Sequence, residues 1–346
     1  MIVQWLKQLH AQDIETGTDH MSVESVPASD NPNRYFPLLH QSIISVSGPD
    51  AGKFLQGQLS CDLKQVDAIG SRLGAHCNIK GHMISLYRVI HADPDTYWLR
   101  TDRGLTESSL NALKRYIIFS KAEAKDCSET FAGVGIAGPD AKAIISGLIE
   151  LNADEPDSVS RMNNTLAVNL PGSRFEIWFP TEESEAVLKH LSAKAAAGST
   201  NDWVLSEIQA GIPDLRPETR EGFIPQMTNL QVFEGVSFTK GCYTGQEIVT
   251  RLQHRGQLKR PMYRARVISK DVPQPGMIIH AATRDNQGQV LLSAATGTPD
   301  EYELLAVMVK DRVEQEQMQL DTPARPTLEI LDLPYQLDKR LFESKR

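Results

Sequence analysis

The chain has 346 residues, of which 40% are hydrophobic, 23% charged and 6% aromatic. This composition is typical of globular proteins and excludes a wholly disordered chain, a fibrous repeat and a small disulfide-stapled scaffold. The 36 basic and 44 acidic side chains give a formal net charge of -8, which argues against broad, non-specific binding to nucleic acid. The longest apolar runs, such as residues 304–309, are far too short to cross a membrane.

The N-terminal residues do not have the pattern of an export signal, because Lys7 and Gln8 interrupt the apolar stretch and no cationic segment precedes it. Residues 17–34 are rich in Ser, Asp, Asn, Thr and Pro, so we interpret residues 1–34 as a flexible lead-in. Met21 is an alternative start to the chain.

Four cysteines, at positions 61, 77, 127 and 242, form no Cys-x-x-Cys pair. A chain of this size does not need disulfide staples, and the spacings show no disulfide framework. We therefore expect reduced thiols and a cytoplasmic location.

Two segments of the chain repeat the same strand–turn–helix pattern. Residues 42–46 are predicted as a strand, and Gly48-Pro49-Asp50 then begins a helix. The sequence motif at residues 46–51 is repeated with small changes at residues 136–141, again between an apolar strand and a helix. This repeat favours a duplicated α+β unit. Further predicted elements are neighbouring strands at residues 81–90 and 97–100, and a helix that Thr181 caps and that stops at Gly198.

The chain changes character from Met262 onward. Four strand-like segments, at residues 263–268, 277–281, 290–293 and 302–309, are separated by prolines, Asp285-Asn286 and Gly288. This spacing predicts a small all-β barrel or sandwich. The charged end of the chain, residues 336–346, is predicted to be a peripheral tail.

The densest chemical signal is the segment from Lys240 to Glu247. Thr244 and Glu247 have capping-box spacing, which predicts a helix with Thr244 as its N-cap. Cys242 would then lie near the positive end of that helix with Lys240 close by, and both features favour the thiolate. The alternative is that Cys242 is a small buried apolar side chain.

The same part of the chain is locally basic. Residues 240–260 contain five basic side chains and one acidic side chain, Glu247, so five minus one gives a local charge of +4. This charge indicates either an anionic ligand or partner, such as a glutamate tail, a phosphate or RNA, or a solvated helix face. The basic residues are Lys240, Arg251, Arg255, Lys259 and Arg260.

The octet Lys-Gly-Cys-Tyr-Thr-Gly-Gln-Glu at residues 240–247 resembles the signature of the YgfZ-type folate-binding proteins. These are relatives of the glycine-cleavage aminomethyltransferase (T-protein) and of a mitochondrial iron–sulfur assembly factor. The resemblance covers roughly residues 36–335. It includes the segments 54–59, 78–81, 115–116, 120–121, 203–213, 223–226 and 229–231.

The resemblance implies an α+β fold: a three-domain, T-protein-like ring with duplicated α+β units and a C-terminal all-β barrel. The first domain would be discontinuous and combine residues 35–130 with residues 203–257. Residues 131–202 would form the second α+β domain, and residues 258–335 the β-barrel domain.

The resemblance also implies a cofactor, tetrahydrofolate or a one-carbon derivative. The residues expected to bind it are Trp203, Tyr243, Gln246 and Arg251, together with Gln41, which falls near the position of a family tryptophan. The functional thiol would be Cys242 with its cationic neighbour Lys240. An aromatic face such as that of Trp203 suits a flat pterin.

The expected role is that of an accessory protein for iron–sulfur cluster assembly or repair. It would thereby support tRNA modification by clients such as the radical enzyme that methylthiolates adenosine in tRNA. A weak tRNA contact through the basic residues 251–260 is a further expectation, and no membrane contact is expected.

Two alternatives stay open at this point. One is a tetrahydrofolate-dependent aminomethyl or one-carbon transferase, although T-protein carries aspartates where Gly81-His82-Met83-Ile84-Ser85-Leu86 has no carboxylate. The other is a redox or persulfide-handling role for the Cys242 thiol.

Overall fold

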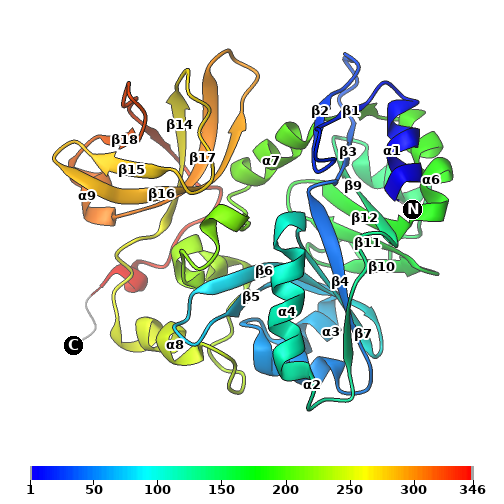
Figure 1. The fold of residues 1–346 in the computed structure, drawn as a ribbon, viewed down its shortest axis with the longest axis horizontal. Helices are drawn as coiled ribbons and strands as arrows, with labels where there is room; N and C mark the ends of the chain where they lie inside the picture. Colours follow the sequence, from blue (N-terminus) through cyan, green and yellow to red (C-terminus); the bar gives the residue numbers. More distant parts are fainter. Residues whose placement is uncertain (1, 344–346) are drawn as a thin grey trace. The chain divides into compact units, whose positions relative to one another are not determined.

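The computed structural model describes residues 2–343, which form two compact units of mixed α and β structure (Figure 1). The first unit contains Met1–Leu55, Leu63–Arg72 and Tyr87–Trp203, and the second contains Gln56–Asp62, Leu73–Leu86 and Val204–Arg346. Among the described helices, none is both long enough and apolar enough to cross a membrane.

One sheet of the first unit has six strands in the order β10-β11-β12-β9-β3-β13. Neighbouring strands are antiparallel except β13, which runs parallel to β3. The strands are β3 (Arg34–Pro37), β9 (Phe131–Ala137), β10 (Val159–Met162), β11 (Thr165–Leu170), β12 (Arg174–Pro180) and β13 (Ala196–Ala197). Apolar residues of α1 (Ile2–His10), α5 (Ala141–Ser146) and α6 (Ser184–Ser192) share one core with this sheet.

A second sheet has five strands in the order β5-β6-β7-β4-β8. The strands are β4 (Gln41–Ser47), β5 (Ser71–Cys77), β6 (Met83–Asp93), β7 (Thr96–Asp102) and β8 (Glu123–Asp126). The helices next to it in the chain are α2 (Ala51–Gln58), α3 (Leu63–Ile69), the 3-10 turn η1 (Arg103–Leu105) and α4 (Thr106–Ile117). The predicted neighbouring strands at 81–90 and 97–100 are the pair β6 and β7.

The repeated sequence phrase has the same local conformation at both places. Strand β4 leads through Gly48 into α2, and strand β9 leads through Gly138 into α5. The two glycines have φ angles of 125° and 130°, a region that L side chains avoid. The prediction of two similar strand–turn–helix units is therefore confirmed at the level of local structure.

The N-terminal residues differ from the predicted flexible lead-in. Helix α1 buries Trp5, Leu6 and Leu9, and Figure 1 shows it beside α6. A short hairpin of β1 (Glu15–Thr16) and β2 (Val23–Ser25) follows. The expectation rested on the polar composition of residues 17–34, and it overlooked the apolar face of the helix that precedes them.

The middle of strand β9 lies directly against two tryptophan rings. A Cβ atom added to Gly133 would lie 2.6 Å from the Trp178 ring, and one added to Gly135 would lie 2.5 Å from the Trp203 ring. Both rings are almost completely buried. Only glycine allows this close approach of backbone and ring.

The predicted helix from Thr181 to Gly198 is shorter in the structure. Residues Thr181–Glu183 form a 3-10 turn (η2), α6 ends at Ser192, and the chain then enters β13. The edge pairing of β13 with β3 takes the place of the last predicted helical residues.

The second unit contains one open antiparallel sheet of six strands in the order β18-β15-β16-β17-β14-β19. The strands are β14 (Met262–Ile268), β15 (Ile278–Ala281), β16 (Arg284–Ala295), β17 (Glu301–Met308), β18 (Met318–Leu320) and β19 (Glu329–Leu331). All four predicted strand segments are confirmed, and they belong to a half-barrel sheet with two edges where a barrel was predicted. Asp285-Asn286 and Gly288, predicted as separators, lie inside β16.

The second unit also contains short helical segments. Most of α7 (Thr200–Gln209) belongs to it, and so do α8 (Gln246–Arg255) and α9 (Lys310–Gln315). The 3-10 turns are η3 (Pro217–Thr219), η4 (Pro225–Thr228), η5 (Leu230–Phe233) and η6 (Lys339–Phe342). The predicted charged tail packs by Leu341, whose carbonyl accepts from the Leu258 amide at 2.8 Å, while residues 344–346 lie outside the described part.

Candidate functional site

Helix α8 begins one residue later than the sequence predicts. Its N-cap is Gly245, which has a left-handed backbone conformation and no side-chain cap. The Tyr243 amide donates to Oε1 of Gln246 at 3.3 Å, so the glutamine takes the role expected for a capping-box partner. The predicted capping box of Thr244 and Glu247 is wrong, because the helix starts after a glycine turn.

The tight approach of another loop explains why this turn needs a glycine. A Cβ atom at Gly245 would lie 2.5 Å from the Asn78 carbonyl oxygen and 2.9 Å from Cβ of Cys77. Gly81, with a φ angle of 76°, would meet Ile248 of α8 at 3.0 Å in the same way. The segment 77–81 and the start of α8 therefore fit together only with small residues at both contacts.

Lys240 is anchored in the interior of the second unit. Its Nζ donates to the carbonyl oxygens of Leu59 and Cys61, each at 2.7 Å, and lies 5.1 Å from the centre of the Tyr243 ring. Burial lowers the pKa of this lysine from 10.5 to about 8, although the charges of Cys61 and Asp62 act in the opposite direction. The structure thus gives the Lys240 ammonium a role in holding residues 59–61.

The four cysteines are free thiols and differ in accessibility. Cys242 is exposed in the loop before α8, whereas Cys61 and Cys77 are buried. Burial raises the pKa of the Cys77 thiol to about 12. Cys242 is therefore the thiol of this site that solvent and partners can reach, and the alternative of a buried apolar cysteine is wrong for it.

Three predicted folate residues lie around the start of α8. The Tyr243 side chain is buried, and its hydroxyl has no hydrogen-bond partner within the described residues. Burial also raises the pKa of this phenol. Gln246 lies in the first turn of α8 and the exposed Arg251 lies further along the helix. Of the predicted basic stretch, Lys259 and Arg260 are exposed, and the Arg255 side chain lies outside the described residues.

Trp203 lies in the core of the first unit. Only 1% of it is exposed, and it contacts the Phe36 ring at a centroid distance of 5.3 Å. The Arg174 guanidinium lies 5.6 Å from the Trp203 ring, and Gly135 lies against that ring. Protein atoms thus already cover the ring that was expected to stack on a pterin.

Gln41 belongs to a buried polar network of the first unit that sequence reasoning did not identify. Its Oε1 accepts from Nη1 of Arg100 at 3.2 Å. Nη2 of Arg100 lies 3.1 Å from Oε1 of Glu176, and the indole N–H of Trp178 donates to Oε2 of the same carboxylate at 3.1 Å. Glu176 is completely buried. A glutamate within the apolar run at residues 175–179 is the signal that could have found it.

Residues 81–86 contain no acidic side chain, but the fold places the carboxylate of Glu221 next to this segment. Oε2 of Glu221 accepts from Nδ2 of Asn78 at 3.1 Å, and the Glu221 amide donates to the carbonyl of Met83 at 2.8 Å. The side chain is partly exposed, with Arg220 at 3.6 Å. Because positions 83 and 221 are far apart in the chain, spacing alone could not predict this contact.

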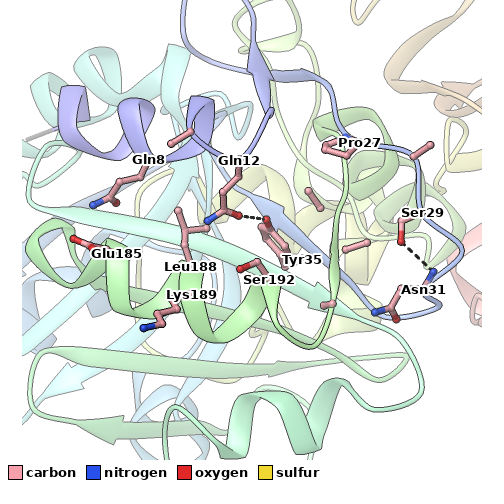
Figure 2. A pocket seen from close by; sticks show the side chains of 15 residues that line it. Gln8, Gln12, Pro27, Ser29, Asn31, Tyr35, Glu185, Leu188, Lys189 and Ser192 are labelled. Carbon is pink, nitrogen blue, oxygen red and sulfur yellow. Dashed lines mark hydrogen bonds between the residues drawn. The ribbon is translucent and has the colours of Figure 1, made fainter.

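The first unit also has a surface pocket of about 750 Å³ (Figure 2). Residues of α1, the loop 27–31, β3 and α6 line it. Two of the lining residues are joined by a hydrogen bond, in which the Tyr35 hydroxyl donates to Oε1 of Gln12 at 2.8 Å. None of the site residues predicted from the sequence lines this pocket.

Comparison with known proteins agrees with this architecture. The GCVT N-terminal domain family matches residues 35–167. The glycine cleavage system aminomethyltransferase T from Bartonella henselae has a similar fold, with a TM-score of 0.78, 14% identity and coverage of 96% of both chains. At this identity the likeness concerns the fold alone.

Two curated relatives are closer in sequence. The tRNA-modifying protein YgfZ of Yersinia pestis (strain Pestoides F) is 31% identical over 316 residues, which is 90% of this chain and 95% of the relative. The tRNA-modifying protein YgfZ of Klebsiella pneumoniae (strain 342) is 32% identical over 305 residues, 86% of this chain and 91% of the relative. This chain therefore belongs to the YgfZ family of tRNA-modifying proteins.

Proposed function

We propose that this protein is a folate-binding accessory protein for iron–sulfur cluster assembly or repair in the cytoplasm. Through that role it would support tRNA modification, including methylthiolation of adenosine by a radical iron–sulfur enzyme. The observation that carries the proposal is the 240–247 loop in a member of the YgfZ family. In this loop Cys242 is exposed, and Lys240 donates hydrogen bonds to the carbonyl oxygens of Leu59 and Cys61. The three-domain ring and its boundaries stay predictions.

The chemistry around the start of α8 fits part of a folate. The buried Tyr243 hydroxyl, which has no partner among the described residues, and the amide nitrogen of Gln246 are polar groups that a bound ligand would satisfy. Arg251 is exposed and suits the carboxylates of a glutamate tail. Tetrahydrofolate or a one-carbon derivative would supply the capacity to carry a one-carbon unit. Because its ring is covered, Trp203 supports the fold in this proposal and does not stack on the pterin.

The assignment of Gln41 to the folate site stays a prediction. Its side chain is buried in the network of the first unit, where Glu176 already pairs with Arg100 and accepts from the Trp178 indole. Glu176→Gln keeps the size of the side chain and removes its charge, so a folate titration of this variant tests whether the network contributes to binding.

Calorimetry with tetrahydrofolate tests the folate part. We expect micromolar-class affinity for the wild type and weaker binding for Arg251→Ala, with Lys270→Ala as a control at an exposed cationic residue outside α8. No heat at high folate concentration would overturn folate binding.

The level of 2-methylthio-modified adenosine in tRNA tests the cellular role. A deletion strain complemented with the wild type should regain the modification, and one complemented with Cys242→Ala should not. Unchanged modification in the deletion strain would overturn the proposal.

A one-carbon transferase is the second candidate function, and Glu221 favours it. This carboxylate lies beside Asn78 and Met83, next to residues 81–86, which contain no acidic side chain of their own. A transferase would use such a group as a general base or to stabilise a cation. An assay for methylenetetrahydrofolate should then detect turnover that Glu221→Gln abolishes. Background signal from the wild type would exclude this function.

A further inference from the structure

The end of helix α4 and the turn after it carry exposed apolar side chains that the fold does not use. We call residues 114–121 the α4 turn. Phe119 is 88% exposed, Ile118 is 72% exposed and Tyr116 is 47% exposed. Single exposed apolar side chains are normal, but three within four residues form a patch of the kind that marks a binding surface.

The same turn carries three cations that are free of ion pairs. Lys114, Arg115 and Lys121 are exposed, and no salt bridge joins them to any described residue. Lys114 and Arg115 also complement the negative end of the α4 dipole, but this does not account for Lys121 or for the apolar side chains. In a chain of net charge -8, this turn is a local positive site.

The acidic groups next to the α4 turn already have partners. Oε2 of Glu123 lies 2.9 Å from Nζ of Lys125, and Oδ1 of Asp126 accepts from the Ser128 amide at 2.8 Å. Asp50 accepts from the Lys121 amide at 2.8 Å. The three cations are therefore available for an external anion.

Backbone hydrogen bonds and a close contact tie the α4 turn to its neighbours. The Ser120 amide donates to the Ile117 carbonyl at 2.8 Å, and the Asp50 amide donates to the Lys121 carbonyl at 3.3 Å. The backbone of Lys121 lies so close to Gly48 that a Cβ atom there would be 2.5 Å from the Lys121 oxygen. A ligand that binds such a fixed turn loses little affinity to ordering it.

A hollow of about 420 Å³ lies beside the turn. Leu110, Lys114 and Ile117 of α4 line one side, and residues 122–126 with strand β8 line the other. Lys114 thus borders both the hollow and the exposed patch.

We propose that the α4 turn binds a single-stranded segment of RNA. The exposed rings of Tyr116 and Phe119 would stack on unpaired bases, and the three cations would contact the phosphates. A duplex covers the faces of its bases, so it cannot use these rings. The site lies outside the proposed folate residues, and the proposal does not depend on folate binding.

Fluorescence anisotropy with a labelled 12-nucleotide oligouridine and the full chain tests the proposal. We expect Phe119→Ala to weaken binding by about 5- to 140-fold, the loss of one stacked base. Lys114→Gln/Lys121→Gln should lower the slope of log K against log salt by about 1.4, since each single-strand phosphate contact adds about 0.7. A duplex of the same length should bind more weakly than the single strand.

Matched controls lie at other exposed positions. Ile268 is 70% exposed, so Ile268→Ala removes a comparable apolar side chain, and Lys270→Gln removes an exposed charge. Both should bind the oligonucleotide like the wild type. All variants should keep the melting temperature of the wild type, because the altered side chains are exposed.

Three results would overturn the proposal. They are no binding by the wild type, equal binding by Phe119→Ala, and a loss that appears only with Lys259→Gln in the basic stretch 251–260. Unchanged RNA affinity in Phe119→Ala together with loss of a protein partner would assign the patch to protein docking instead. Folate calorimetry on Phe119→Ala should match the wild type, which separates this result from the folate proposal.

Discussion

Replacing Lys240 with methionine should change how the stability of the protein depends on pH. Burial lowers the pKa of this lysine from 10.5 to about 8 in the folded protein. Between these values the unfolded chain binds more protons than the folded protein, so stability rises with pH over this window. The cost of the buried ammonium is complete below about pH 8 and disappears near pH 10.5.

The size of the effect follows from the two pKa values. Their difference of about 2.5, at about 1.4 kcal/mol per pH unit, gives an upper bound of about 3.5 kcal/mol. Lys240 retains some contact with solvent, so we expect about 1–3 kcal/mol. The contacts of Nζ with the carbonyls of Leu59 and Cys61 are also lost in the variant, but the carbonyls do not titrate.

Urea unfolding followed by circular dichroism at pH 7, 8, 9 and 10 measures this effect. The wild type should gain stability relative to Lys240→Met as the pH rises, and Lys270→Met at an exposed lysine should show no such change. A constant difference between wild type and Lys240→Met would refute the reasoning. A difference that changes in the opposite direction would mean that the two carbonyls and the Tyr243 ring raise the pKa of Lys240.

Three further results are expected. Gly245→Ala should destabilise the protein by at least about 1–2 kcal/mol in urea unfolding, because a left-handed residue would meet the Asn78 carbonyl, whereas Gly241→Ala, with open space around it, should be nearly neutral. Glu176→Ala should cost about 3–5 kcal/mol in the same assay, because it removes the carboxylate that pairs with the buried Arg100 guanidinium; an effect below 1 kcal/mol would contradict the buried pair. Under native conditions iodoacetamide should modify Cys242 well before Cys77, and mass spectrometry of peptides would reveal the reverse order.

Local sequence patterns predicted much of the fold. The strands β4, β7, β14 and β17 were found from short apolar runs, and the repeated phrase at 46–51 and 136–141 indicated two equivalent turns. These features depend on neighbouring residues, so one segment of sequence contains most of the necessary information.

Local patterns could not predict contacts between residues that are far apart in the chain. The left-handed turn at Gly245 is required by the approach of Asn78, so the capping-box spacing misplaced the start of α8. The partners of Lys240 lie near position 60, and the partner of Asn78 is Glu221. The octet identified the site region, but these contacts decide the environment of each side chain.

The glycines of β9 bear on how this family can vary. Because Gly133 lies under the Trp178 ring and Gly135 under the Trp203 ring, neither glycine can change while its tryptophan stays. Each glycine can change only together with the tryptophan that lies against it. A smaller side chain must replace the indole before, or at the same time as, a larger residue replaces the glycine. In relatives of this chain, substitutions at 133 and 178, and at 135 and 203, should therefore occur jointly.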